Sequence, residues 1–382
     1  MTDEAGKTKP DRGTATERQP PPAPVEFEAL HEIVKRARQN LGQNDWDYIV
    51  GGSESETTLR RNRLALDSIA FRPRVLRDVG TVDLATEHFG RRLRLPLLLA
   101  PVGALEMFHA GAGAAVARAA QGFGVAHMMS SVCKPGLEEV AAAAPAALRI
   151  FQLYALGDDA FVDDHLARAT ACGYEAFALT VDTAYYSRRE RDIAKRHFTS
   201  GRARVAGRDH LARLDWRTVE RLRGKSKLPL ILKGIATAED ARIALDHGVD
   251  WIYASNHGGR QLDHGRGTME MLPEIADAIG GRARIMIDGG FCRGTDVIKA
   301  IAAGADLVGL GRMQCFALAA AGEAGIRRLL ELLEDEIRRT LGLLGVTSFA
   351  ELDRSYIQPA APTAVPHVLS AFPLLSIDEY RY

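Results

Sequence analysis

The stretch YASNHGGRQLD, residues 253–263, places an imidazole and a guanidinium three residues apart, directly after a short apolar run. His257 is of the residue type that accepts a proton near neutral pH. Arg260 carries a planar guanidinium that matches a carboxylate through two parallel hydrogen bonds. Together they could hold a substrate carboxylate and remove a proton from the neighbouring carbon or hydroxyl. The spacing therefore predicts an acid–base site for a carboxylic acid.

Three residues elsewhere in the chain extend this chemistry. Asp182, in LTVD, could accept a hydrogen bond from His257 and fix its tautomer. Arg189, in YYSRRERDI, could supply a second cation for the carboxylate. Lys233, in LILKG, could stabilise negative charge that develops on an electron-accepting ring. No histidine and carboxylate spacing resembles a metal site, so the expected chemistry needs no metal.

Short apolar runs, each followed by a polar or glycine cluster and then by a helix-like segment, must position these residues. Runs that are continuously apolar indicate strands buried on both faces, and hence a parallel sheet covered by helices. Eight such units are typical of a (β/α)8 TIM barrel, an α/β fold that carries its chemistry at the carboxyl ends of the strands. The predicted strands lie at 95–101, 126–131, 149–154, 176–182, 228–234, 251–257, 283–290 and 306–312.

Polar residues and glycines recur at all eight of these strand ends. Any one of them could simply cap a strand, but packing does not explain a whole ring of them on one rim. Glycines after strands seven and eight could let backbone N–H groups approach a phosphate, with Arg312 and Arg293 adding charge-assisted bonds. The strand-end residues are Pro101, Val102, Gly103, Ser130, Gln152, Tyr154, Thr180, Asp182, Lys233, Ser255, His257, Asp288, Gly289, Gly290, Gly311 and Arg312.

A doubly wound dinucleotide-binding fold is the alternative to the barrel. Its evidence is limited to Gly111 and Gly113, because no third glycine follows at the required spacing. The pair is also expected to lie inside a helix rather than in a phosphate-binding turn. The sequence therefore favours the barrel.

The segments outside the strands indicate one domain, residues 26–382, preceded by a tail. Residues 1–25 are polar and proline-rich and lack the apolar region of a secretory signal, so a disordered tail is expected. Residues 26 to about 44 are predicted to form a helical cap on the barrel. Residues 323–345 have apolar side chains at helical spacing and are expected to close the domain.

The composition argues against several classes of partner. Lysine plus arginine equals aspartate plus glutamate at 49 each, so no net positive field favours nucleic acid. The longest apolar runs are too short to span a bilayer. Four cysteines without C-x-x-C spacing fit a reducing compartment, so the cytoplasm is the expected location.

Several longer segments occur together in the order of one known family. SNHGGRQ, APVGA, FQLY, LTVDT, RRERDI, LILKG, DGGFCRGTDV and GLGR all resemble motifs of the FMN-dependent α-hydroxy acid oxidase and dehydrogenase family. The resemblance is clearest over residues 47–326. It implies a (β/α)8 barrel that binds FMN at its strand ends and oxidises an L-2-hydroxy acid to the 2-oxo acid.

The resemblance also implies a role for each matching residue. His257 would be the base, oriented by Asp182. Its partner would be a small-molecule substrate, a 2-hydroxy acid, held by Tyr48, Tyr154, Arg189 and Arg260. FMN would contact Pro101, Val102 and Gly103 at its reactive edge, Ser130, Gln152 and Thr180 at its pyrimidine, Lys233 near N1, and Ser255, Asp288, Gly289, Gly290, Gly311 and Arg312 along its ribityl phosphate. The expected assembly is a homotetramer, and oxygen, a quinone or a protein remains open as the electron acceptor.

Four departures from the family pattern bear on function. Cys292 stands where the family usually has an arginine near the phosphate, so that contact either passes to Arg293 or is lost. Met313 replaces the customary proline. Val132 stands where glycolate oxidase carries a tryptophan, which predicts a larger, apolar substrate. The stretch between Arg189 and residue 227 is shorter than usual and lacks an apolar anchor, which argues against a membrane-attached member.

Two other functions are compatible with such a barrel. An isomerase or a peptide-modifying redox enzyme could use FMN differently, and a non-catalytic module could merely bind flavin or phosphate. The combination of Tyr48, Arg189, His257 and Arg260 favours hydroxy acid oxidation over both.

Overall fold

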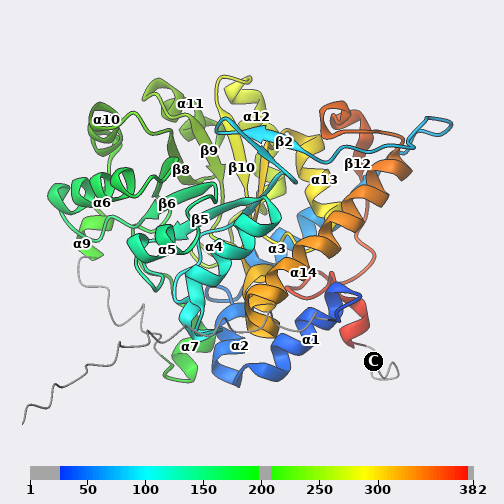
Figure 1. The fold of residues 1–382 in the computed structure, drawn as a ribbon, viewed down its shortest axis with the longest axis horizontal. Coiled ribbons are helices and arrows are strands. Elements are labelled where there is room, and N and C mark those ends of the chain that lie inside the picture. Colours follow the sequence, from blue (N-terminus) through cyan, green and yellow to red (C-terminus); the bar gives the residue numbers. More distant parts are fainter. Residues whose placement is uncertain (1–25, 198–207, 377–382) are drawn as a thin grey trace, which may run out of the picture.

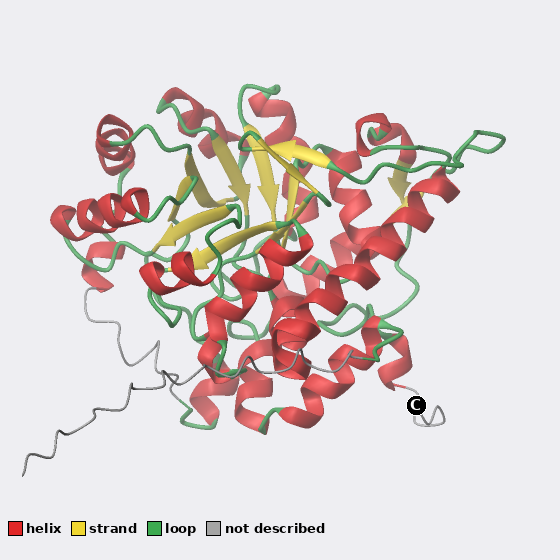
Figure 2. Cartoon of the chain, viewed as in Figure 1, coloured by secondary structure: helices red, strands yellow, loops and turns green. Residues whose placement is uncertain are grey.

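The computed structural model describes residues 26–197 and 208–376. The tail expected over residues 1–25 lies outside the described residues. Eight parallel strands form a closed barrel surrounded by helices, which confirms the predicted (β/α)8 architecture (Figures 1 and 2). The strands are β4 (Leu97–Leu99), β5 (Ala126–Ser130), β6 (Arg149–Leu153), β7 (Ala176–Thr180), β8 (Leu230–Ile235), β9 (Trp251–Ala254), β10 (Arg284–Ile287) and β11 (Leu307–Leu310).

Each predicted run matches one strand and is longer than it. Seven of the eight runs lose residues at the carboxyl end, where polar or glycine residues leave the ladder and enter the loops above the barrel, whereas β8 extends through Ile235. The side chains inside the barrel are almost all apolar, which explains the continuous hydrophobicity of the runs. This interior cluster comprises Leu93, Leu98, Ala126, Met128, Leu148, Ile150, Ala176, Ala178, Ile231, Trp251, Tyr253, Met286 and Leu307.

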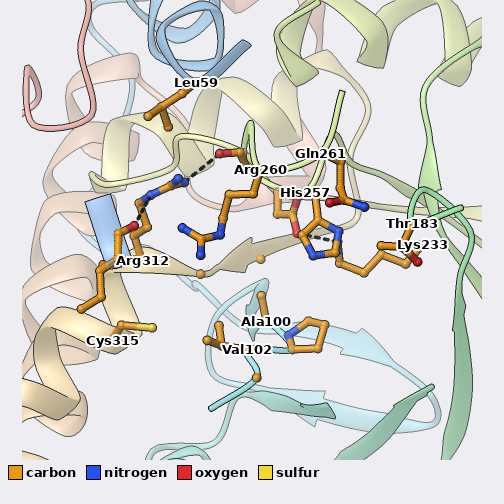
Figure 3. A pocket seen from close by; sticks show the side chains of 18 of the residues that line it. Leu59, Ala100, Val102, Thr183, Lys233, His257, Arg260, Gln261, Arg312 and Cys315 are labelled. Atoms are coloured by element: carbon orange, nitrogen blue, oxygen red, sulfur yellow. Dashed lines mark hydrogen bonds and ion pairs between the residues drawn. The ribbon is translucent and has the colours of Figure 1, made fainter. Parts of the chain in front are cut away.

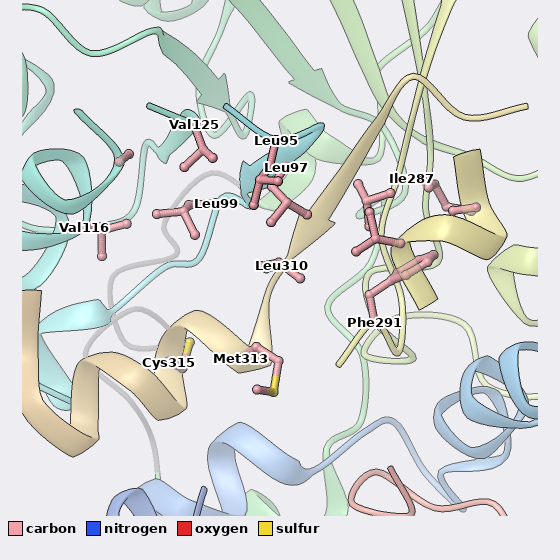
Figure 4. Close-up of a cluster of buried hydrophobic side chains, with 14 of the residues drawn as sticks. Leu95, Leu97, Leu99, Val116, Val125, Ile287, Phe291, Leu310, Met313 and Cys315 are labelled. Carbon is pink, nitrogen blue, oxygen red and sulfur yellow. The ribbon is translucent and has the colours of Figure 1, made fainter. Parts of the chain in front are cut away.

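The outward side chains of the strands pack against the helices. Figure 4 shows Leu99 of β4 and Leu310 of β11 in one buried cluster with Val116 and Met313 of the covering helices. Thr237 caps the amino terminus of α11, where its hydroxyl accepts a hydrogen bond from the Asp240 N–H. The helices between strands are α4 (Ala112–Phe123), α5 (Leu137–Ala143), α6 (Asp159–Ala171), α10 (Trp216–Lys225), α11 (Ala238–Asp246), α12 (Thr268–Ile279) and α13 (Gly294–Ala303).

The pair Gly111 and Gly113 does not form a dinucleotide loop. Gly111 precedes the first residue of α4, and Gly113 lies within its first turn. A methyl group at Gly113 would approach the Cys133 sulfur to 3.0 Å, so this glycine serves helix packing. The doubly wound alternative is therefore wrong.

The helical cap extends further than predicted. It consists of α1 (Leu30–Asn40), α2 (Gln43–Val50) and α3 (Thr57–Asp67), and the helix predicted to end near residue 44 is in fact two helices separated at Leu41. The closing helix α14 (Arg312–Leu344) also begins earlier, directly after β11, and is broken at Ala321 and Gly322. The Asn40 side-chain amide donates to the carbonyls of residues 319 and 320 at this break, which joins α1 to α14 (Figure 1).

Smaller elements close the two ends of the barrel. A hairpin of β2 (Thr86–His88) and β3 (Arg91–Leu93) covers the amino-terminal end, where Phe89 stacks on Trp251 at 4.7 Å between ring centroids. The cap helix α2 lies at the other end beside α7 (Glu190–Ala194) (Figure 1). The remaining elements are β1 (Ile69–Phe71), which pairs with β12 (Ile357–Pro359), α9 (Arg208–Leu211), and the 3-10 turns η1 (Leu105–Met107), η2 (Phe349–Glu351), η3 (Arg354–Tyr356) and η4 (Pro373–Ser376).

Candidate active site

A cavity lies over the carboxyl ends of the barrel strands. Figure 3 shows His257, Arg260 and Arg312 on one side of it, facing Ala100 and Val102 on the other. The structure thus brings together residues that are up to 264 positions apart in the chain. The predicted site residues that line this cavity are Tyr48, Pro101, Val102, Gly103, Tyr154, Arg189, Lys233, His257, Arg260, Asp288, Gly289, Gly290, Gly311 and Arg312.

The loop after β9 turns sharply to present its polar side chains. His257, Gly258 and Gly259 all have positive φ, at 59°, 65° and 76°. This conformation is unfavourable for a residue with a Cβ, by about 1–2 kcal/mol. The Ser255 hydroxyl accepts a hydrogen bond from the His257 N–H at 3.0 Å and supports the turn. The strain is thus located at the residue whose imidazole faces the cavity.

The imidazole of His257 is held between Asp182 and Tyr154. Its Nδ1 lies 3.0 Å from a carboxylate oxygen of Asp182, and its Nε2 lies 3.1 Å from the Tyr154 hydroxyl. Burial lowers the pKa of His257 below its usual value, although the Asp182 carboxylate opposes this shift. Burial alone would raise the pKa of Asp182, but the nearby imidazole more than offsets it and the pKa is lowered. A neutral imidazole that donates from Nδ1 to Asp182 leaves Nε2 free to accept a proton.

Two guanidinium groups face the same region of the cavity. Arg260 donates to the carbonyls of Tyr48 and Gly51, and its guanidinium lies 4.7 Å from the Tyr48 ring centroid. Arg189 lies 5.0 Å from the Tyr186 ring centroid, and its buried Nε has no hydrogen-bond partner among the described residues. Burial and the charge of Arg189 lower the pKa of Arg260. An anion between the two cations would relieve this repulsion, so the arrangement suits a carboxylate.

The floor of the cavity is formed by Lys233 and Asp288, which belong to the first of two polar groups of side chains at the strand ends. Lys233 Nζ donates to Ser255 Oγ at 2.8 Å and lies 3.3 Å from a carboxylate oxygen of Asp288. Ser255 Oγ in turn donates to Asp288 at 2.6 Å. These contacts bind three of the predicted cofactor residues into one network on adjacent strands.

The second group lies on β5, β6 and β7. Ser130 pairs in register with Gln152, whose side-chain amide donates to Thr180 Oγ1 at 2.8 Å. The amide oxygen of Gln152 is buried and has no partner among the described residues. Buried polar atoms in native proteins are almost always hydrogen-bonded, so this oxygen calls for a donor such as a ring N–H of a bound ligand. The polar edge of a flavin ring fits that requirement.

Glycines line the part of the cavity at the carboxyl ends of β10 and β11, where the sequence predicts a phosphate site. Gly289 and Gly290 have φ values of 108° and 86°, which favour glycine over any other residue. A methyl group at Gly311 would meet no atom within 4 Å, so the backbone is open at the amino terminus of α14. Helix amino termini with approachable N–H groups bind phosphate well. Arg312 adds positive charge, although its guanidinium already donates to the carbonyls of residues 49, 51 and 258.

Near the predicted phosphate region, one expected arginine lies outside the cavity and one unexpected arginine lies in it. Arg293 is not among the cavity-lining residues that the structure describes, because its guanidinium pairs with Glu336 at 2.5 Å. Arg63, which the sequence analysis missed, lines the cavity beside Cys292. It donates to the Gly290 carbonyl at 3.1 Å and is paired with Asp296 at 2.8 Å. No motif marks Arg63, because it comes from α3, outside the repeating strand–helix units.

An apolar wall completes the cavity. Val132 lines it, as expected from the sequence, together with Tyr186 and Phe108. A methyl group at Gly103 would lie 2.7 Å from a Val132 methyl, so Val132 already occupies the space that the missing side chain leaves. No sequence motif marks the other apolar lining residues, which include Leu156, Leu211 and Val368.

Two kinds of feature are absent from the described residues. Among residues 26–197 and 208–376, no cluster of histidine, cysteine and acidic side chains could hold a metal ion. None of the helices in the same ranges is both long and apolar enough to cross a membrane.

Comparisons with known proteins agree with this site. A family model described as FMN-dependent dehydrogenase matches residues 37–359. Glycolate oxidase 3 of Arabidopsis thaliana is 38% identical over 369 residues, which cover 91% of this chain and 100% of that protein. Glycolate oxidase 1 of Zea mays is 40% identical over 355 residues, which cover 87% and 94%.

Solved structures give the same result. A mandelate oxidase variant with a C4a-OH-FMN adduct superposes with a TM-score of 0.78 at 40% identity, covering 84% of this chain and 96% of that one. Mandelate oxidase with (S)-2-phenylpropionate gives a TM-score of 0.81 at 39% identity, covering 88% and 100%. The unpaired Gln152 oxygen and the glycine-lined phosphate region fit the cofactor that these comparisons imply. The chain therefore belongs to the FMN-dependent dehydrogenase family and is an FMN-dependent α-hydroxy acid oxidoreductase.

Proposed function

We propose that this protein oxidises an L-2-hydroxy acid with an apolar substituent to the 2-oxo acid, with His257 as the base. The observation that carries the proposal is the His257–Asp182 pair, which faces Arg189 and Arg260 across one cavity. FMN, when bound, supplies the acceptor for the hydride that leaves the substrate carbon.

The side chains that line the cavity bind the substrate and move its hydroxyl proton. Arg189, Arg260 and the Tyr48 hydroxyl bind the substrate carboxylate, and Tyr154 lies beside the substrate hydroxyl. His257 Nε2 takes the proton of the substrate hydroxyl, and the hydrogen on the substrate carbon leaves as hydride with the electrons of the C–H bond. The electron pair that the proton leaves on oxygen then forms the carbonyl double bond. Asp182 stabilises the resulting imidazolium and keeps Nδ1 protonated throughout.

We assign the cofactor contacts to the floor and the glycine-lined part of the cavity. Lys233 places a positive charge beside the ring, and Asp182 does not contact the cofactor. Arg293 is assigned to its pair with Glu336 instead, which leaves Arg312 as the cation for the phosphate. The other contacts are Pro101, Val102 and Gly103 at the reactive edge, Ser130, Gln152 and Thr180 at the pyrimidine, and Ser255, Asp288, Gly289, Gly290 and Gly311 along the ribityl phosphate.

The apolar wall supports a substrate larger than glycolate. Val132, Leu156, Leu211 and Val368 present apolar surface toward the cavity, from segments both inside and outside the barrel. Burying an apolar substituent gains roughly 25 cal/mol per Å². A phenyl or branched alkyl group would thus gain a few kcal/mol over glycolate by roughly the same measure. The structural relatives named mandelate oxidase support the same choice.

Anaerobic bleaching of the yellow enzyme with a panel of hydroxy acids tests the proposal. Reduction by mandelate or 2-hydroxyisocaproate, but not by simple alcohols, is the expected result. Bleaching by no 2-hydroxy acid in the panel would overturn it. Admitting air afterwards tests the acceptor: the name oxidase in the relatives supports oxygen over a quinone or a protein.

We also propose a homotetrameric assembly, a single domain and a cytoplasmic location. The homotetramer is supported by exposed apolar side chains at Val75, Leu76 and Leu343, which a partner subunit would cover. The single domain over residues 26–382 is supported by the match to residues 37–359 and by the packing of α1 on α14. The cytoplasm is supported by the four unpaired cysteines.

A further inference from the structure

A tyrosine stands inside the barrel in a cluster of apolar side chains, with one charged pair, Lys233 and Asp288, beside it. Tyr253 of β9 is fully buried, and its interior cluster otherwise contains Ala, Leu, Ile, Met and Trp251. Its hydroxyl has no hydrogen bond of normal geometry to any described residue. A buried hydroxyl without a full hydrogen-bond partner is destabilising, because it has given up its hydrogen bonds to water. Phenylalanine would fill nearly the same volume without that cost, so the presence of the hydroxyl indicates that it has a role.

Gly309 of β11 locates this hydroxyl. A methyl group at Gly309 would overlap the Tyr253 hydroxyl oxygen and would lie 3.2 Å from Asp288 Cβ. The φ angle of Gly309 is not positive, so the glycine is required by the volume of the phenol and not by its backbone conformation. Gly309 and Asp288 both line the cavity. The phenol oxygen therefore lies directly beneath the cavity floor, on the side of Asp288.

Lys233 lies on the face of the same ring. Lys233 and Tyr253 are paired in register between β8 and β9. The ammonium is 4.9 Å from the Tyr253 ring centroid, a distance at which the electron-rich face attracts a cation. The same ammonium is 3.3 Å from the Asp288 carboxylate. Tyr253 thus contacts one member of this ion pair with its ring and lies beside the other with its hydroxyl.

The hydroxyl remains a donor at every working pH. Burial and the negative charge of Asp288 raise the pKa of Tyr253 well above its usual value. A protonated phenol near a carboxylate lowers the negative potential there when the positive end of its O–H dipole is turned toward the carboxylate, even where the two groups form no hydrogen bond of normal geometry. Less of the Lys233 charge is then neutralised by Asp288.

We propose that Tyr253 is a positioning residue that keeps the charge of Lys233 available to the flavin, by supporting the ammonium with its ring and sharing the Asp288 carboxylate with its hydroxyl. The proposal rests on the assignment of Lys233 to the flavin ring made above. A positive charge stabilises the anionic reduced ring more than the neutral oxidised ring. Tyr253 therefore raises the reduction potential of the bound cofactor.

The test is the reduction potential of the holoenzyme with Tyr253→Phe, which keeps the ring and removes the hydroxyl. We expect reduced FMN to lose about tenfold in affinity relative to oxidised FMN, which lowers the potential by about 30 mV. The Kd for sulfite, which adds to the flavin as an anion, should rise by a similar factor of about ten. The FMN content should be unchanged.

Tyr174→Phe is the matched control. Tyr174 is another buried tyrosine, and its hydroxyl donates to the Leu137 carbonyl at 2.9 Å, among residues that do not line the cavity. This variant should keep the parent potential and sulfite affinity. Gly309→Ala should destabilise the parent, and Tyr253→Phe should restore most of that loss, because the two groups compete for the same space.

Lys233→Met separates the inference from the proposed function. If Lys233→Met lowers the potential and Tyr253→Phe leaves it at the parent value, the role of Tyr253 is overturned while the assignment of Lys233 stands. If Lys233→Met leaves the potential unchanged, both are overturned, because Tyr253 acts through Lys233.

Discussion

The imidazole Nδ1 of His257 lies 3.0 Å from the carboxylate of Asp182, although the two residues are 75 positions apart in the chain. They belong to the ends of β9 and β7, which are separated in the barrel only by β8. Nε2 points instead to Tyr154 and the cavity. This one relationship fixes which nitrogen is the base.

Replacing His257 should abolish catalysis while sparing the cofactor. We expect His257→Asn to retain FMN and to slow flavin reduction by about 10² to 10⁴-fold, the range of general base catalysis. Stopped-flow bleaching with saturating hydroxy acid measures this rate. A rate within about threefold of the parent would remove His257 from the mechanism.

The pH dependence should follow the neutral form of His257. The base must be unprotonated, and burial lowers its pKa below the ordinary 6.5. Activity is therefore lost only as the pH falls through that lowered pKa, so kcat/KM should be flat near pH 7 and decline below 6.5. Asp182→Asn removes a neighbour that raises the pKa of His257. Its decline should start at lower pH, with a smaller plateau, and a decline shifted to higher pH would contradict the pairing.

Arg260→Lys should weaken substrate binding more than turnover. Lysine keeps the charge but cannot donate to the carbonyls of Tyr48 and Gly51 and to a carboxylate in the same planar geometry. Loss of one charge-assisted hydrogen bond predicts a KM about tenfold higher or more. Arg188→Lys, at an exposed neighbouring arginine, is the control. An unchanged KM would mean that Arg189 alone binds the anion.

Val132 should govern substrate size. The parent is expected to prefer mandelate or 2-hydroxyisocaproate over glycolate in kcat/KM, because Val132 leaves room beside Leu156 and Tyr186. Val132→Trp should lose activity on mandelate and keep or gain activity on glycolate. The prediction is contradicted if glycolate has the highest kcat/KM with the parent enzyme, or if Val132→Trp keeps the parent kcat/KM on mandelate.

Arg63→Met should destabilise the fold. Arg63 and Asp296 are both buried and form an ion pair at 2.8 Å, so removing the cation leaves a buried charge uncompensated. The expected loss is about 3–5 kcal/mol in the free energy of unfolding. Urea titration of the FMN-saturated enzyme measures it. Arg339→Met, which breaks an exposed pair with Asp335, should cost far less, because water screens that pair.

The sequence by itself determined the barrel and the residues at its rim. A strand buried on both faces is continuously apolar, so polar residues follow it at the point where the chain leaves the sheet. That rule places Lys233 and His257 at strand ends without any structure. The same rule places Asp182 at a strand end, where it contacts His257, and the motifs added Arg189 and Arg260, which line the cavity.

Only the tertiary structure decided which side chains from outside the barrel reach the site. Arg63 comes from α3, Leu211 from α9 and Val368 from the segment after β12, and none of them follows the strand–helix period. Arg293 lies only five residues after Asp288, yet its side chain turns away to Glu336. The reason is physical: position along a strand fixes which face a residue occupies, but packing between distant segments fixes where a flexible side chain or a capping helix points.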